Sequence, residues 1–134
     1  MYREYNPSPV GRHTGDCAVR ALAKALDTDW ETAFVKLCMN GFAMGDMPNT
    51  ASVFGATLRK NGFYRAAIPN TCPDCYTAEH FCRDNPDGTF VLVFDNHVAT
   101  VKDGDLYDSF DSTDMIPFAV WYEEDNPPKG EDDE

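Results

Sequence analysis

The stretch HVATVKDGDLYD, residues 97–108, decides the fold, because it encodes two strands and the turn between them. Asp-Gly at 103–104 is a strong signal for a two-residue hairpin turn. Residues that pair across such a hairpin share a face, and alternate residues along each strand return to that face. His97 and Asp108 then share one face as diagonal neighbours, about 7–8 Å apart at the backbone. This parity selects Asp108, and not Asp111, as the carboxylate within reach of His97.

Apolar periodicity divides the rest of the chain into helices that come first and strands that come later. Three- and four-residue apolar spacing predicts helices, and short alternating or β-rich runs between turn residues predict strands. A Thr-x-x-Glu capping box at 28–31 opens the second helix. Residues 1–15 and 41–48 are predicted to be irregular. The sequence therefore predicts an α+β domain, with N-terminal helices packed on a C-terminal antiparallel β-meander. The predicted helices span about 16–26, 30–40, 50–61 and 77–84, and the predicted strands span 63–68, 89–94, 97–102, 105–110 and 118–122.

The chain has 134 residues, which is enough for one core, and its formal net charge is −12. Half of that charge lies in residues 123–134, which hold seven acids and one Lys. We therefore expect a single domain over 1–122, followed by a disordered acidic tail over 123–134. An acidic surface repels phosphate backbones and anionic lipid, so neither nucleic acid nor a membrane is an expected partner. The sequence leaves the oligomeric state open.

Five cysteines and the first residues of the chain bear on the cellular compartment. The N-terminal segment has no apolar stretch of the kind found in a signal peptide. An odd number of cysteines without such a signal is typical of reduced thiols in the cytoplasm. We therefore expect a cytoplasmic protein in which any cysteine with a role is catalytic or metal-binding.

Cys17 stands at the predicted start of the first long helix, where free backbone N–H groups and the helix dipole stabilise a thiolate. A thiolate nucleophile needs a base, and the candidates are His13, His80 and His97. His97 is favoured because a strand holds its side chain firmly and because Asp108 can orient the ring. Cys17, His97 and Asp108 then form the nucleophile, base and orienting acid of a cysteine hydrolase. This chemistry requires no metal or cofactor.

The order of these motifs resembles that of the papain-like cysteine peptidase superfamily, with the small C39-like peptidases nearest in size. The matching segments are GDCAVRAL at 15–22, HVATV at 97–101 and YDS at 107–109. The same segments are similar to uncharacterised proteins of gut bacteria and their phages. The resemblance implies a papain-like fold, a covalent acyl-enzyme and a peptide or protein substrate. A hydrolase and an acyltransferase both fit this pattern, because the acyl group can pass to water or to an amine.

Papain-like enzymes commonly hold the oxyanion with a Gln that precedes the Cys, and this chain contains no Gln. Asn6, His13 and Asn96 are the side chains considered as replacements, beside the backbone N–H of the nucleophile. Asn6 is favoured because the Pro that follows it fixes its backbone. For the substrate groove the candidates are His13, Met44 and Met47, although segment 41–49 also reads as a tight interhelical loop.

Two alternatives remain open at this stage. The same fold can serve as a non-catalytic acidic interaction protein, for example a phage- or mobile-element-encoded inhibitor that binds a basic host surface. A C-x2-C-x4-H spacing also suggests a zinc site, although the last two ligands would point about 200° apart on a helix. A redox-active or disulfide-forming pair, or ordinary thiols, also fit this cluster. Its members are Cys72, Cys75, His80 and Cys82.

Overall fold

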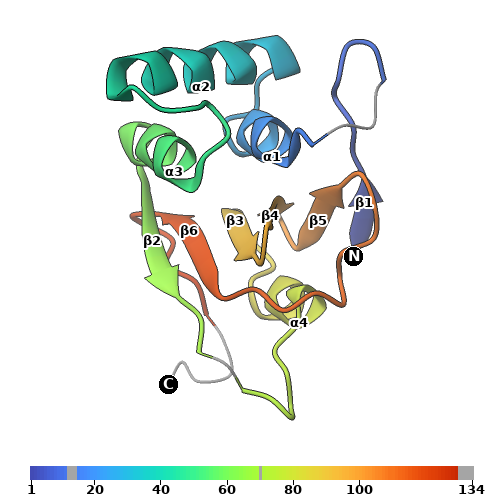
Figure 1. The fold of residues 1–134 in the computed structure, drawn as a ribbon. Helices are drawn as coiled ribbons and strands as arrows, with labels where there is room; N and C mark the ends of the chain where they lie inside the picture. The colour runs from blue at the N-terminus through green and yellow to red at the C-terminus, as the bar shows by residue number, and fades with distance from the viewer. Residues whose placement is uncertain (12–14, 70, 130–134) are drawn as a thin grey trace.

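The computed structural model describes residues 1–11, 15–69 and 71–129. A mixed six-stranded sheet forms its middle layer, three helices cover one face of the sheet, and a short helix covers the other face (Figure 1). The α+β class predicted from the sequence is therefore correct. Within the described part of the chain, no helix combines the length and the apolar character needed to cross a membrane.

The helices follow the predicted apolar periodicity, with two differences in the second helix. Asp29, and not Thr28, caps α2 by accepting a hydrogen bond from the Thr32 N–H at 2.7 Å. This helix also continues through the first half of the predicted 41–48 loop, until Gly45 ends it with a φ of 69° that favours glycine. Thr50 caps α3 as predicted. The helices are α1 Cys17–Ala25, α2 Trp30–Met44, α3 Ala51–Lys60 and α4 Ala78–Asp84.

The strand order in the sheet is β1-β5-β4-β3-β6-β2. The meander prediction is correct for β3, β4 and β5, but β6 returns to pair with β3, and β2 pairs with β6. The first strand lies in the segment predicted to be irregular, and it pairs in parallel with β5. Three-residue β1 carries no periodicity that a sequence reading could detect. The strands are β1 Tyr2–Glu4, β2 Phe63–Ala67, β3 Thr89–Phe94, β4 His97–Lys102, β5 Asp105–Asp108 and β6 Ala119–Glu123.

The predicted hairpin is present in the expected register. Lys102 pairs with Asp105, and Thr100 pairs with Tyr107. Asp103 and Gly104 make the turn with φ values of 50° and 81°, as a type I′ turn requires. This register confirms the parity argument and brings the two ends of the hairpin, at His97 and Asp108, together at one end of the sheet.

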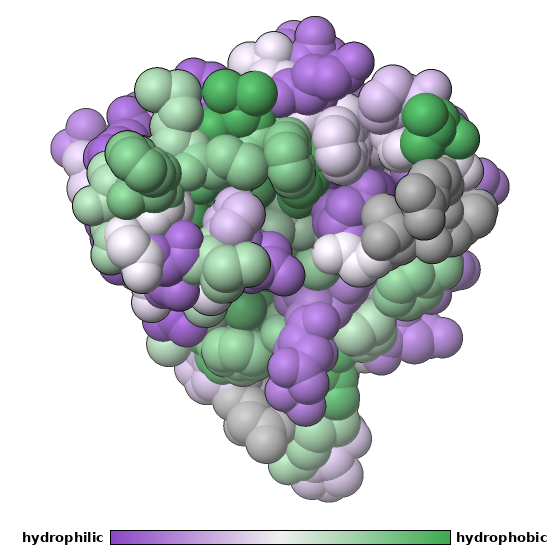
Figure 2. Space-filling view, turned by 45° about the horizontal axis from the view of Figure 1, so that its top comes forward, coloured by the Kyte–Doolittle hydropathy of each residue, from purple (hydrophilic) through white to green (hydrophobic). Residues whose placement is uncertain are grey.

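Two apolar clusters hold the layers together, one on each face of the central strand β3. Val91 belongs to the cluster under α1, α2 and α3, and Phe90 and Leu92 belong to the cluster that packs against α4. β3 is therefore apolar on both sides, as expected for a strand buried on both faces. The outer side of the helix layer is also apolar in part, because Met39 and Phe42 of α2 are 67% and 91% exposed. Figure 2 shows hydrophobic side chains gathered on this layer.

The acidic C-terminal segment differs from the disordered tail that the sequence predicts. Glu123 is the last residue of β6. Further on, Asn85 binds the backbone of Lys129 twice, because its Oδ1 accepts from the Lys129 N–H and its Nδ2 donates to the Lys129 carbonyl, each at 2.7 Å. The expectation of disorder therefore does not hold for Glu123, which belongs to the sheet, or for Lys129, whose backbone is bound at the end of α4. Residues 130–134 lie outside the described residues.

Candidate active site

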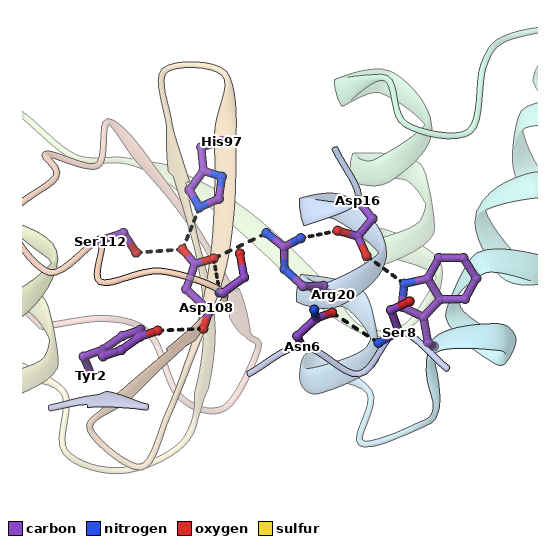
Figure 3. A network of polar contacts seen from close by, with 10 residues as sticks. Tyr2, Asn6, Ser8, Asp16, Arg20, His97, Asp108 and Ser112 are labelled. Carbon is purple, nitrogen blue, oxygen red and sulfur yellow. Dashed lines mark hydrogen bonds and ion pairs between the residues drawn. The ribbon is translucent and has the colours of Figure 1, made fainter. Parts of the chain in front are cut away.

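His97 and Asp108 meet at the open end of the hairpin. The His97 Nε2 lies 2.6 Å from the Asp108 Oδ2, and the two side chains are 11% and 1% exposed (Figure 3). Both residues stand at strand ends, where the regular ladder stops and side chains from other elements can approach. The sequence prediction that Asp108 is the acid facing His97 is confirmed by this contact.

The Asp108 carboxylate is surrounded by donors. The Ser112 hydroxyl donates to Oδ2 and the Ser109 N–H donates to Oδ1, both at 2.7 Å, while Arg20 Nη2 lies 3.4 Å from Oδ1. Burial raises the pKa of Asp108, but the hydrogen bonds from His97, Ser112 and Ser109, together with the charge of His97, bring that pKa below its ordinary value. Asp108 is therefore held as a carboxylate behind the imidazole.

Cys17 is the first residue of α1 and lies half-buried at the same end of the sheet. Helix α1 packs on the hairpin, and the Thr100 hydroxyl of β4 donates to the Ala21 carbonyl of α1 at 2.7 Å. Burial raises the pKa of Cys17, but hydrogen bonds with His97 and with the Val98 backbone, and the charges of His97 and Arg20, lower it overall. The thiol therefore ionises more readily than an ordinary cysteine.

The imidazole has the complementary shift. Burial lowers the pKa of His97, but the hydrogen bonds and charges of Asp108 and Cys17 raise it to about 9. Because Nε2 faces Asp108, Nδ1 is the ring nitrogen left for the thiol. These opposite shifts favour proton transfer from Cys17 to His97, which pairs a thiolate with an imidazolium.

Two aromatic rings hold the imidazole between them. The Phe94 centroid lies 5.8 Å and the Phe110 centroid 5.0 Å from the His97 ring. Phe94 belongs to the core, whereas Phe110 is 48% exposed and covers the outer side. The imidazole therefore packs against one buried ring and one partly exposed ring.

A second line of polar contacts reaches the site from α1 and α2. Arg20 contacts Asp16 through Nη1 and Asp108 through Nη2, and the Trp30 indole N–H donates to the Asp16 Oδ2 at 2.9 Å. Figure 3 shows the Arg20 guanidinium between the two carboxylates. Neither this arrangement nor the role of Ser112 is predicted from the sequence. The available signal was a charged pair with i,i+4 spacing, Asp16 and Arg20, in a helix whose face is otherwise apolar.

Of the residues considered as oxyanion donors, Asn6 and Asn96 lie in the described part of the chain. The Asn6 Oδ1 accepts from the Ser8 N–H at 3.3 Å, and Figure 3 shows Asn6 beside Arg20. Its role at the oxyanion stays a prediction. Asn96 forms the turn before His97 with a φ of 58°. The predicted His13 lies outside the described residues.

Met44 and Met47 are not brought to the site. Trp30 at the start of α2 contacts the residue that precedes Cys17, and Met44 is the last residue of the same helix. At 1.5 Å per residue, about 20 Å separate the two ends of α2. The two methionines extend the exposed apolar side of the helix layer instead.

The cysteine cluster does not form the zinc site considered from the sequence. Cys72 and Cys75 form a disulfide, which the C-x-x-C spacing permits. Cys82 is buried, and the His80 Nδ1 accepts from the Thr77 N–H in the capping box of α4. Among the described residues, no group of three or more His, Cys, Asp or Glu side chains is placed to hold a metal ion. The expectation of reduced thiols does not hold for this pair, which takes the disulfide alternative, whereas Cys17, Cys38 and Cys82 are free.

Comparisons of this chain with protein-family models, with curated proteins and with solved structures find no match.

Proposed function

We propose that this chain is a papain-like cysteine hydrolase that cleaves a peptide, isopeptide or related amide bond. One observation carries the proposal: a thiol at a helix start, an imidazole and a buried carboxylate form a continuous line of contacts from Cys17 through His97 to Asp108. This is the nucleophile, base and orienting-group arrangement of covalent acyl transfer. The opposite pKa shifts of Cys17 and His97 support it, because they favour the reactive ion pair.

In the acylation step, the Cys17 thiolate attacks the carbonyl carbon of the substrate and forms the C–S bond. The carbonyl electrons move to oxygen and give a tetrahedral oxyanion. The His97 imidazolium then donates its proton to the departing amine nitrogen, the C–N bond breaks, and a thioester remains on Cys17. His97 is neutral at this point, and Asp108 keeps its ring in orientation.

In the deacylation step, neutral His97 takes a proton from water, and the resulting hydroxide equivalent attacks the thioester carbonyl. The C–S bond breaks, and Cys17 returns to the thiolate beside a protonated His97. The carboxylic acid product leaves and releases its remaining proton to the solvent. An amine that replaces water at this stage gives an amide product, so the same residues support an acyltransferase.

The start of α1 supplies a donor for the oxyanion. The first N–H groups of a helix have no partner within the helix, and they carry its positive dipole end. The Asp16 side chain stands at the cap position but makes no capping hydrogen bond, because its oxygens contact Arg20 and Trp30. The Cys17 N–H therefore meets no competing carboxylate from the cap residue. Asn6 is the proposed second donor.

Alkylation of Cys17 tests the proposal without knowledge of the substrate. The wild-type protein and the variants Cys17→Ala and His97→Ala are each incubated with iodoacetamide or E-64 at a series of pH values. Peptide mass analysis then locates the label. We expect Cys17 to react at pH 6, where an ordinary thiol of pKa about 8.5 is almost entirely protonated. The reaction disappears in Cys17→Ala and weakens strongly in His97→Ala.

His80→Ala is the matched control, because His80 caps α4 on the opposite face of the sheet and should leave the reaction unchanged. A wild-type Cys17 that titrates like an ordinary thiol contradicts the proposed function. In that event the acidic interaction protein on the same fold becomes the better hypothesis.

A further inference from the structure

Arg20 lies one helical turn after the start of α1, and its guanidinium is enclosed between two acidic side chains. Its side chain is 8% exposed, and the carboxylates of Asp16 and Asp108 are 5% and 1% exposed. Nη1 contacts Asp16 and Nη2 contacts Asp108, while Nε has no hydrogen-bond partner among the described residues. The two ends of the fork therefore connect the helix that carries Cys17 with the strand that carries Asp108 (Figure 3).

The contact with Asp108 fixes a specific oxygen of that carboxylate. Arg20 and the Ser109 N–H approach Oδ1, whereas His97 and Ser112 approach Oδ2. Each oxygen of the carboxylate therefore has its own contacts: those at Oδ1 fix the orientation of the carboxylate, and those at Oδ2 include the imidazole. Rotation of the carboxylate away from His97 would break the contacts to Oδ1 as well.

The contact with Asp16 acts on the start of the helix. An Asp at the cap position ordinarily accepts hydrogen bonds from the N–H groups of the first turn. Here those N–H groups receive no hydrogen bond from Asp16, whose oxygens are held by Arg20 and Trp30. A free Asp16 would turn toward the first turn and place a negative charge beside the Cys17 sulfur, where it would oppose thiolate formation.

We propose that Arg20 is a positioning residue of this site, whose guanidinium holds Asp108 behind His97 and holds Asp16 away from the helix start where the Cys17 thiolate forms. This inference rests on the proposed cysteine chemistry and adds a residue that the papain-like resemblance does not supply. Burial raises the pKa of Cys17, and the positive charge of Arg20 is among the causes that bring it below its ordinary value, in agreement with this role. Lys cannot replace the fork fully, because its single ammonium cannot present two separated donors to two carboxylates.

The test measures the rate of Cys17 alkylation by iodoacetamide as a function of pH. The midpoint on the acid side of this rate profile reports ionisation of the Cys17 thiol. Arg20→Met removes the charge and frees Asp16, so we expect the midpoint to rise by about one pH unit or more. Arg20→Lys keeps the charge without the fork and should give a smaller rise. Asp16→Asn removes the negative charge while Arg20 stays, so its midpoint should fall or stay at the wild-type value. Arg20→Met combined with Asp16→Asn should return the midpoint toward that of the wild type.

Arg3→Met is the matched control. Arg3 also pairs with an aspartate, Asp105 at 3.1 Å, but its side chain is 54% exposed and belongs to the β1–β5 edge. This variant should leave the midpoint unchanged. Thermal unfolding identifies the variants that fold, and if Arg20→Met does not fold, Arg20→Lys and Asp16→Asn carry the comparison.

The outcomes separate this inference from the proposed function. A wild-type Cys17 with an ordinary thiol midpoint contradicts the function itself. A wild-type midpoint that is low, together with unchanged midpoints in the folded Arg20 variants, overturns the positioning role alone. The role is also overturned if Asp16→Asn raises the midpoint as Arg20→Met does, since a purely structural contact would shift both variants in the same direction.

Discussion

The His97 Nε2 and the Asp108 Oδ2 lie 2.6 Å apart, although the two residues belong to different strands and are eleven positions apart in the chain. The two-residue turn at 103–104 produces this meeting, because it fixes the register of β4 against β5. The pKa of His97 and the pH range of the proposed reaction both depend on the contact.

Asp108→Asn should lower the pKa of His97 from about 9, because burial lowers that pKa and the carboxylate is a main cause that raises it. The pH above which His97 loses its proton, and the ion pair with Cys17 is lost, would then fall. The rate of amide cleavage should decrease by about 10²-fold or more, since general acid–base catalysis contributes on that order. NMR titration of the His97 ring measures the first effect. Asp111→Asn removes an exposed carboxylate nearby and should change neither, and an unchanged His97 titration in Asp108→Asn would contradict the assignment.

Cys17→Ser should change how stability depends on pH. The pKa of His97 is raised in the folded state, so its contribution is complete below the unfolded value of about 6.5 and is lost as pH rises toward its folded value. In the wild type, unfolding releases the imidazolium proton while the thiolate, whose pKa is lowered, takes one up. Because these two effects oppose each other, the free energy of unfolding of the wild type changes little with pH between about 6.5 and the folded pKa of His97.

Without a titrating thiol, only the His97 effect remains. The free energy of unfolding of Cys17→Ser should therefore decrease between pH 6.5 and the folded pKa of His97, with a slope of at most about 1.4 kcal/mol per pH unit. Urea unfolding at several pH values measures both proteins. Parallel curves for the wild type and the variant would show that the two groups are not an ion pair.

Ser112→Ala should destabilise the protein by about 1–3 kcal/mol, because it leaves a buried carboxylate oxygen with one donor fewer. The Ser112 hydroxyl and His97 share the Asp108 Oδ2. Thr113→Ala is the control, since the Thr113 hydroxyl binds the exposed Asp111 at 2.6 Å and its loss should cost less than about 0.5 kcal/mol. Equal costs in chemical unfolding would argue against a buried network around Asp108.

Asn85→Ala should release the segment that follows β6. The variant loses both hydrogen bonds to the Lys129 backbone and a third, at 3.1 Å, to the Phe81 carbonyl. We expect a loss of about 1–3 kcal/mol and faster amide exchange at Lys129. Asn126→Ala removes a single exposed hydrogen bond to the Asp87 carbonyl and should have a smaller effect. Exchange at Lys129 that is already fast in the wild type would contradict the packed arrangement.

Thiol counting tests the cysteine pairing. The chain unfolded without reductant should take up three carbamidomethyl groups, on Cys17, Cys38 and Cys82, and five groups after reduction. Loss of the disulfide in Cys72→Ser should cost about 2 kcal/mol, because the closed loop is very short. Alkylation of native Cys17 should not change, since the pair lies in the segment that leads into α4. Five labelled thiols without reductant would contradict the disulfide.

Much of the fold could be predicted from local patterns. The apolar stripes of α1 and α3, the Thr50 cap and the Asp-Gly turn each depend on residues within one or two turns of chain. The two main errors have different causes. Asp29 caps α2 in place of Thr28 through a local hydrogen bond with the Thr32 N–H, so the capping box was placed one residue too early. β1 formed because it could pair with β5, which lies about a hundred residues further along the chain.

The sequence by itself determined which residues could form the triad, because a helix start, a strand alternation and a two-residue turn are all set by short-range hydrogen bonds and sterics. Only the tertiary structure brought Cys17 to His97 and inserted Arg20 between Asp16 and Asp108, residues that lie far apart in the chain. The physical reason is that such meetings depend on how the helix layer packs on the sheet. That packing is fixed by apolar surfaces contributed by many segments, whose joint arrangement no local pattern records.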